Sequence, residues 1–174
     1  MYSSSWSERG GLWRRSLLAL VSLALLPVAA YALETGEPAP SVELSTRKGK
    51  FDWHGLKGQV VYLDFWASWC GPCRKSFPWM NEIQKKYADK GFKVVGVNLD
   101  ANMADADKFL EKVPAEFQLV FDPQGVSPRL YGVKGMPTSY LIDRSGKVIY
   151  RHMGFNDEGK AELEKAIRSA LEQK

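Results

Sequence analysis

Apolar residues along this chain fall into short continuous runs and into runs that repeat every three or four positions. Residues 60–66 are apolar except for one acid, and residues 92–99 form a second such run, which predicts two buried strands. From Cys73 onward apolar residues recur with a helical period, so we expect an amphipathic helix that Gly91 ends. Pro78 lies inside this helix and should kink it near its start, because proline removes a backbone donor.

The rest of the pattern predicts smaller elements around this unit. A helix over 103–113 follows the second strand, which makes a βαβ crossover and therefore a parallel pair of strands. Residues 138–143 and 148–152 predict an antiparallel hairpin across the turn at 144–147. Asn156 is expected to cap a C-terminal helix whose apolar face docks on the sheet. The other predicted elements are edge strands at 41–44 and 51–53, a turn at 55–58, a short strand at 119–121, and a turn with a short helix within 122–132.

The first residues of the chain have the features of an export signal. Arg14 and Arg15 precede the apolar run 17–30, and small residues stand where a signal peptidase cuts, so we expect residues 1–32 to be a signal peptide cleaved after Ala32. The apolar run is roughly 14 residues long, short of the ~20 that a membrane-spanning helix needs. This favours a cleaved signal, and an uncleaved N-terminal anchor stays open. The arginine pair also fits the twin-arginine route, which we rank lower.

Composition indicates one ordinary globular domain after this signal. With 174 residues, of which 45% are hydrophobic, the chain can bury one core. Pro38 and Pro40 oppose a helix, which predicts a linker at 33–40 ahead of a single domain at 41–174. The net charge is +4 and no lysine or arginine cluster forms a stripe, so the charge indicates no nucleic-acid partner. We expect a monomer.

Cys70 and Cys73 are the only cysteines in the sequence, and they flank Gly71 and Pro72. They lie where the predicted strand meets the helix, and a helix N-terminus lowers the pKa of a thiol. Exported domains usually place their cysteines in structural disulfides. A bridge across two residues closes too short a loop to stabilise a fold strongly. We therefore interpret the two cysteines as a reactive pair and not as a structural disulfide.

Taken in order, these elements resemble the thioredoxin superfamily. The strand, the Cys-Gly-Pro-Cys turn, the helix with Pro78, the Gly-Met-Pro-Thr segment at 135–138 and the closing hairpin carry the resemblance, which covers residue 41 to the C-terminus. It implies an α/β thioredoxin fold, with a central mixed sheet flanked by helices, an N-terminal strand extension and an inserted βα segment. The export signal and the helical segment between residues 99 and 119 look most similar to the TlpA, ResA and cytochrome c maturation branch.

The resemblance implies three catalytic residues. Cys70 would be the nucleophile that attacks a disulfide, and Cys73 would resolve the mixed disulfide. Asp64 lies within the apolar run, so we expect it in a low dielectric with a raised pKa, and by resemblance it assists proton transfer at Cys73. The alternative that Asp64 faces solvent at the end of its strand stays open. Gly96 stands where cytosolic thioredoxins carry a lysine near the buried acid, so that lysine's part in proton handling is not implied here.

Five residues are expected to form the surface that binds a client protein. Pro137 resembles the family's cis-proline, which would bring Met136 beside the cysteines and offer its backbone to an extended substrate. Trp69, Gly71 and Pro72 belong to the motif itself, and we expect Trp69 to be partly exposed. Pro72 has no backbone donor, so fewer amides stabilise the thiolate than with another residue there. This favours a reductant over a strong oxidant.

The sequence therefore predicts an exported thiol-disulfide oxidoreductase that reduces protein disulfides without a cofactor. We expect it in the periplasm or another extracytoplasmic space, soluble after signal cleavage or tethered by an anchor. A reductant in an oxidising compartment needs an electron source, so the implied partners are a membrane thiol-disulfide donor and oxidised clients. Apocytochrome c and copper-site proteins are both possible clients of this branch.

Other functions on the same residues stay open as alternatives. A copper chaperone could use both thiolates with His152 and either Met136 or Met153. A thiol peroxidase could use the same scaffold. Structural zinc is disfavoured because only His54 and His152 could complete its ligand set, and we assign no metal site. Arg74 stands where a haem-attachment motif requires histidine, which excludes that function.

Overall fold

The two apolar runs form neighbouring parallel strands at the middle of a sheet. The computed structural model describes residues 33–173, and within them seven strands form one sheet in the order β2-β1-β5-β4-β3-β6-β7. β4 pairs parallel with both β3 and β5, whereas β6 runs antiparallel to β3 and β7 antiparallel to β6. The strands are β1 Ser45–Thr46, β2 Gly49–Lys50, β3 Val60–Trp66, β4 Phe92–Asn98, β5 Gln118–Phe121, β6 Thr138–Ile142 and β7 Val148–Met153.

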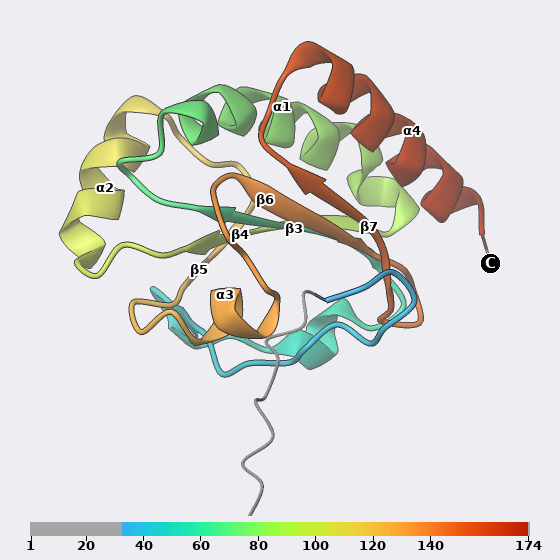
Figure 1. Ribbon diagram of the computed structural model, residues 1–174, viewed down its shortest axis with the longest axis horizontal. Helices are drawn as coiled ribbons and strands as arrows, with labels where there is room; N and C mark the ends of the chain where they lie inside the picture. Colours follow the sequence, from blue (N-terminus) through green and yellow to red (C-terminus); the bar gives the residue numbers. More distant parts are fainter. Residues whose placement is uncertain (1–32, 174) are drawn as a thin grey trace, which may run out of the picture.

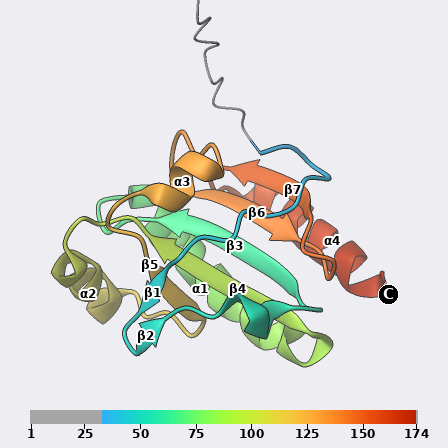
Figure 2. The same cartoon turned by 90° about the horizontal axis from the view of Figure 1, so that it is seen from below.

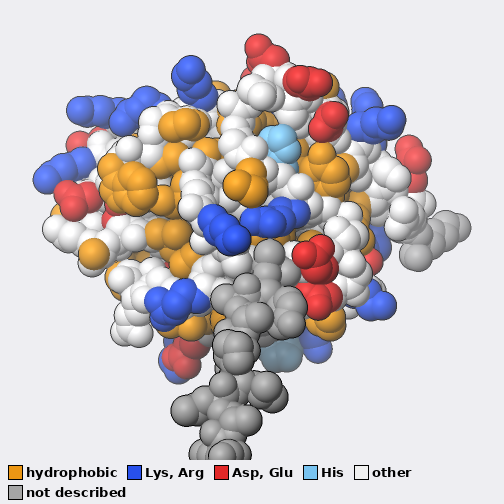
Figure 3. Space-filling model, viewed as in Figure 1, with side chains coloured by type: hydrophobic (Ala, Val, Ile, Leu, Met, Phe, Trp, Pro, Cys, Tyr) orange, Lys and Arg blue, Asp and Glu red, His pale blue; other side chains and the backbone are white. Residues whose placement is uncertain are grey.

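Helices cover both faces of this sheet. α1 and α4 lie on one face, and α3 lies on the other together with the segment that contains β1 and β2 (Figures 1 and 2). The helices are α1 Gly71–Tyr87, α2 Met103–Lys112, α3 Val126–Leu130 and α4 Asp157–Glu172, with short 3₁₀ helices η1 Trp53–Leu56 and η2 Ala88–Lys90. On the face of the molecule seen in Figure 3, lysine and arginine side chains are interspersed with acidic and hydrophobic ones. The mixed, helix-flanked sheet confirms the predicted fold class.

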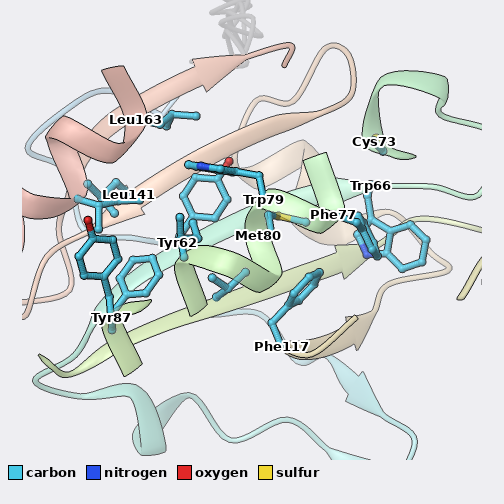
Figure 4. Packing of buried hydrophobic residues seen from close by; sticks show 14 of the residues in the cluster. Tyr62, Trp66, Cys73, Phe77, Trp79, Met80, Tyr87, Phe117, Leu141 and Leu163 are labelled. Atoms are coloured by element: carbon cyan, nitrogen blue, oxygen red, sulfur yellow. The ribbon is translucent and has the colours of Figure 1, made fainter. Parts of the chain in front are cut away.

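Alternation along β3 divides the core in two. Tyr62 and Trp66 point toward α1 and α4, where they pack in a cluster that includes both cysteines (Figure 4). Leu63 and Phe65 point to the opposite face and pack with residues of α3 and the N-terminal segment. Successive side chains of a strand point to opposite faces, so both faces of this central strand are buried. A shift of β3 by one residue in its register would exchange the side chains that lie on the face of the cysteines for those on the opposite face.

Helix α1 begins directly after a cysteine, and the short 3₁₀ helix that follows it ends at a glycine. Cys70 is the N-cap residue, and Pro72 lies in the first turn, where its missing N–H removes no hydrogen bond within the helix. Pro78 lies inside the helix. The chain then passes through η2 to Gly91, which has a φ of 76° and adopts the left-handed conformation that glycine tolerates best. Apolar side chains of α1 fill the space above β3 and β4, which seats the helix beside the active-site strand.

The predicted edge strands at 41–44 and 51–53 are wrong. The hairpin is shorter and lies between them, at β1 and β2, with Ser45 paired to Phe121 of β5. The extended chain stops after Phe51 because the Asp52 carboxylate accepts the backbone N–H of His54 and caps η1. η1 also occupies the first half of the stretch predicted as a turn at 55–58.

The predicted linker at 33–40 is part of the fold. Gly36 donates its backbone N–H to the Val148 carbonyl at 2.7 Å, and Ala39 donates to the Gly146 carbonyl at 2.9 Å. Leu33 is buried against the second core. Prolines oppose a helix but allow extended chain along a sheet edge, which is how this segment runs beside the β6–β7 hairpin.

The predicted signal peptide at 1–32 lies outside the described residues. Among the helices of residues 33–173, none combines the length and the apolar character needed to span a bilayer.

Candidate active site

The two cysteines form a disulfide at the junction of β3 and α1. Their Cα atoms are 5.3 Å apart, and the Cys70 Sγ accepts the backbone N–H of Cys73 at 3.2 Å. Cys70 retains 4% exposure whereas Cys73 retains none. In the reduced protein, a thiolate on Cys70 would therefore receive a helix-capping hydrogen bond and the favourable field of the helix N-terminus. The same position leaves Cys70 as the accessible sulfur of the pair.

A buried carboxylate fixes the loop that precedes the disulfide. Asp100 follows β4, and its oxygens accept the Ser68 backbone N–H at 2.9 Å, the Ser68 hydroxyl at 2.9 Å and the Asn98 amide at 2.8 Å. Asp100 is only 6% exposed. Asp100 is not among the residues predicted from the sequence. Its signal is an acid directly after a buried parallel strand, because the carboxyl ends of neighbouring parallel strands meet at one edge of a sheet.

Replacing Asp100 with alanine should loosen this loop and lower stability. The variant loses several hydrogen bonds to a buried charged acceptor, and we expect the free energy of unfolding to fall by about 3 kcal/mol. Urea unfolding would measure this loss of stability. The rate of disulfide exchange would show whether the loosened loop impairs the cysteine pair. Asp143 is a matched control, because it holds the β6–β7 turn by accepting the Ser145 N–H and hydroxyl. Asp143→Ala should lower stability and leave the exchange rate unchanged; equal rates for both variants would contradict the role of Asp100.

Asp64 is buried on the cysteine-bearing face of the sheet. It is 1% exposed, and its Oδ2 is among the buried atoms without a hydrogen-bond partner in residues 33–173. Burial raises the pKa of this carboxyl well above its usual range, as the sequence predicts. Its neighbours across the sheet are Gly96 on β4 and Ser139 on β6.

The position opposite Asp64 has no room for a long side chain. A Cβ atom on Gly96 would lie 2.9 Å from the Phe117 ring and 3.2 Å from the Trp66 indole nitrogen. A lysine could not enter there without moving these side chains. Glycine at position 96 therefore leaves the space that these aromatic side chains occupy beneath α1 and α2.

The loop that leads into β6 lies beside the cysteine cluster. The Met136–Pro137 peptide bond is cis, as the sequence predicts. Met136 packs against both cores, including the cluster that holds the cysteines. The Pro137 carbonyl accepts the Gly154 N–H at 2.8 Å, which ties the loop to the end of β7.

Residues on either side of Cys70 are open to solvent. Trp69 is 72% exposed, more than the partial exposure expected of it, and Gly71 and Pro72 are exposed as well. These three residues and the sulfur of Cys70 lie within one short stretch. The five predicted client-binding residues thus come from the start of α1, with the residue that precedes Cys70, and from the loop before β6.

Two of the residues proposed as copper ligands, His152 and Met153, point away from each other. His152 and Met153 are consecutive on β7, so their side chains point to opposite faces of the sheet. In residues 33–173, no three side chains of histidine, cysteine, aspartate or glutamate are grouped so that they could hold a metal ion.

Comparisons with known proteins agree with this geometry. A family model described as Redoxin matches residues 34–167. The thiol-disulfide oxidoreductase ResA of Bacillus thuringiensis subsp. konkukian is 34% identical over 137 residues, which cover 78% of this chain and 78% of that protein. ResA of Geobacillus thermodenitrificans is 34% identical over 145 residues, with 77% and 82% covered. In the crystal structure of a candidate thiol:disulfide interchange protein DsbE from Chlorobium tepidum, the identity is 59% and the TM-score 0.78, with 80% of this chain and 99% of that chain covered.

Proposed function

Because the chain belongs to the Redoxin family and is a ResA-like thiol-disulfide oxidoreductase of the thioredoxin superfamily, we propose that it acts mainly as a reductant of protein disulfides. The observation that carries this proposal is the asymmetry of the cysteine pair. Cys70 caps α1 and retains 4% exposure, whereas Cys73, one turn inward, retains none. Such a pair can present one sulfur to a client and keep the other for resolution.

The proposed reaction passes through a mixed disulfide. The Cys70 thiolate attacks one sulfur of the client disulfide, and the other client sulfur leaves as a thiolate. Cys73 then gives up its proton and attacks the Cys70 sulfur, which forms the Cys70–Cys73 disulfide and releases the reduced client. Lowering the Cys70 pKa from about 8.5 to about 7 would require roughly 2 kcal/mol of thiolate stabilisation, which a helix N-terminus can supply.

Asp64 is proposed to accept the Cys73 proton. It lies on the same face of β3 as the cysteine cluster and has a raised pKa because it is buried. A carboxylate in a low dielectric is a stronger base than one in water. Without such a base, Cys73 would have to lose its proton to solvent that does not reach it.

The client is proposed to bind across the disulfide in an extended form. Met136 and Pro137 would offer a backbone edge, as in recognition by strand addition. Trp69 would contribute an exposed aromatic surface on the other side, with Gly71 and Pro72 allowing close approach of the client's cysteine. Apocytochrome c and copper-site proteins are candidate clients of this kind.

We place the reaction outside the cytoplasm, on the basis of the export features of residues 1–32. Electrons would come from a membrane thiol-disulfide donor, because an oxidising compartment does not return the pair to its dithiol form. The protein would be soluble after cleavage of the signal or held by an anchor.

Equilibration with defined thiol-disulfide buffers would test the direction of the reaction. We expect a midpoint potential closer to that of thioredoxin, about −270 mV, than to that of a strong oxidant, about −120 mV. Replacing Pro72 with alanine restores a backbone amide to the first turn, so Pro72→Ala should move the potential toward the oxidant end. A wild-type potential near the oxidant value, with faster oxidation of dithiols than reduction of disulfides, would refute a reductant.

A further inference from the structure

A row of polar side chains crosses the sheet at the level of Asp64. Ser139 of β6 pairs with Asp64 of β3 on one side and with His152 of β7 on the other. Directly paired residues point to the same face, with Cβ atoms about 4.5–5.5 Å apart. Asp64, Ser139 and His152 therefore lie in line on the face that α1 and α4 cover.

The other side of Asp64 is closed to proton exchange. There its neighbour is Gly96, and the space above that glycine is filled by Phe117, Leu119 and the Trp66 indole. The Trp66 Nε1 can donate a hydrogen bond but cannot accept a proton. Polar groups that could pass on the Asp64 proton are found toward β6 and β7.

A tyrosine side chain lies next to the first two members of the row. Tyr62 precedes Asp64 by two residues on the same face of β3, so its side chain is a neighbour of Asp64 and lies diagonally across from Ser139 of β6. Its ring packs edge-on against Trp79 with the centroids 5.6 Å apart (Figure 4). Burial raises the pKa of the Tyr62 hydroxyl well above its usual range. Such a hydroxyl releases a proton only as it accepts another.

The row ends at an imidazole that is half-buried at the sheet edge. A Cβ atom on Gly159, in the first turn of α4, would collide with the His152 ring, so this glycine leaves the ring its place. The Asn156 side chain lies beside the same position, and Asp157 and Glu158 belong to the same turn. A neutral imidazole has one ring nitrogen that can accept a proton and one that can donate a proton, so it can pass a proton on.

We propose that Tyr62, Ser139 and His152 form a proton path between Asp64 and solvent. The path rests on the proposed function, in which Asp64 takes the proton of Cys73. No electrons move along it. As Cys73 attacks Cys70, its proton passes to Asp64, then through the two hydroxyls to the imidazole and to water. The released client thiolate takes up one proton from solvent, so the reaction balances.

Rapid mixing of the reduced protein with a peptide disulfide separates the steps. The rate at which the mixed disulfide forms measures the attack of Cys70 on the peptide. The rate at which the peptide is released measures the attack of Cys73 on Cys70. Tyr62→Phe keeps the ring and removes only the hydroxyl, so we expect it to slow the release phase about tenfold in weak buffer and leave the first phase unchanged. Ser139→Ala should behave alike, and Ser139→Thr should restore the rate because it restores a hydroxyl.

His152→Gln adds a readout that a structural role would not change. Its slow release phase should recover when imidazole is added, because free imidazole can take a proton at the exposed end of the row. Tyr150→Phe is the matched control, since Tyr150 lies on the same face of β7 and its hydroxyl meets Glu162 instead. This variant should release peptide at the wild-type rate.

The possible outcomes separate the path from the function it serves. Slow release in Tyr62→Phe, Ser139→Ala and His152→Gln, with imidazole rescuing the last, supports the path. Wild-type release in any of the three, or slowing that imidazole does not relieve in His152→Gln, overturns it. If the wild-type protein forms no mixed disulfide with any peptide tested, the proposed function itself fails.

Discussion

Replacing Cys73 with serine should leave client proteins covalently attached to Cys70. The variant keeps the accessible sulfur at the N-terminus of α1 but loses the only thiol that can displace the client. Because serine is a far weaker nucleophile toward sulfur, each molecule should react once and stop. Non-reducing electrophoresis of an extract from cells that express Cys73→Ser would show the adducts, and mass spectrometry would identify the clients.

The matched variant for this experiment is Cys70→Ser. It retains a single thiol that is fully buried, so it should capture no client under the same conditions. Adducts in equal amounts from both variants would mean that Cys73 is accessible and would contradict the assigned order of attack. Wild-type protein that neither reduces nor oxidises model disulfides, together with an empty Cys73→Ser sample, would refute the oxidoreductase mechanism proposed for this pair.

Replacing Asp64 with asparagine should make the protein more stable at neutral pH. Burial raises the pKa of Asp64 in the folded state, so the folded protein binds this proton more tightly than the unfolded chain does. The wild-type contribution is then fully present below the ordinary aspartate pKa and is lost as pH rises toward the folded-state pKa. In that window the wild type should lose about 1.4 kcal/mol for each pH unit, and Asp64→Asn should not.

Urea unfolding from about pH 4 to about pH 8 would measure this difference. Asp143→Asn is the control, because hydrogen bonds from Ser145 and Lys147 lower the pKa of Asp143 despite some burial. Its effect on the pH dependence therefore falls below about pH 4, outside this window. A wild-type stability that is flat across the window would show that Asp64 titrates normally.

The large elements follow from local signals in the sequence. Strand β3 and helix α2 lie within one residue of their predicted bounds, and the β6–β7 hairpin turns where Gly146 predicts it. Long apolar runs and a glycine turn dominate the conformation of their own segment. The segment 33–40 and the β1–β2 hairpin are predicted wrongly because they pair with residues far along the chain, 33–40 with the β6–β7 hairpin and β1 with β5. No local pattern in the sequence marks such distant pairings.

The active site divides in the same way. The cysteine pair can be recognised from the sequence because both residues lie in one motif. Asp64 can be recognised because an acid interrupts an apolar run. Ser139 carries no such local mark, and the only local signal of Asp100 is its place after a buried strand. They become part of the site only through the register of β4 and β6 against β3, which the sequence alone leaves undetermined.

The segment from Leu33 to Leu56 packs against the core that lies on the far side of the sheet from α1 and α4. The face with the cysteine cluster is thus free of the chain that enters the domain. A bulky tag fused directly ahead of Leu33 should therefore not obstruct the access of a client to Trp69. The domain can in this sense be held from one side while it exchanges electrons on the other.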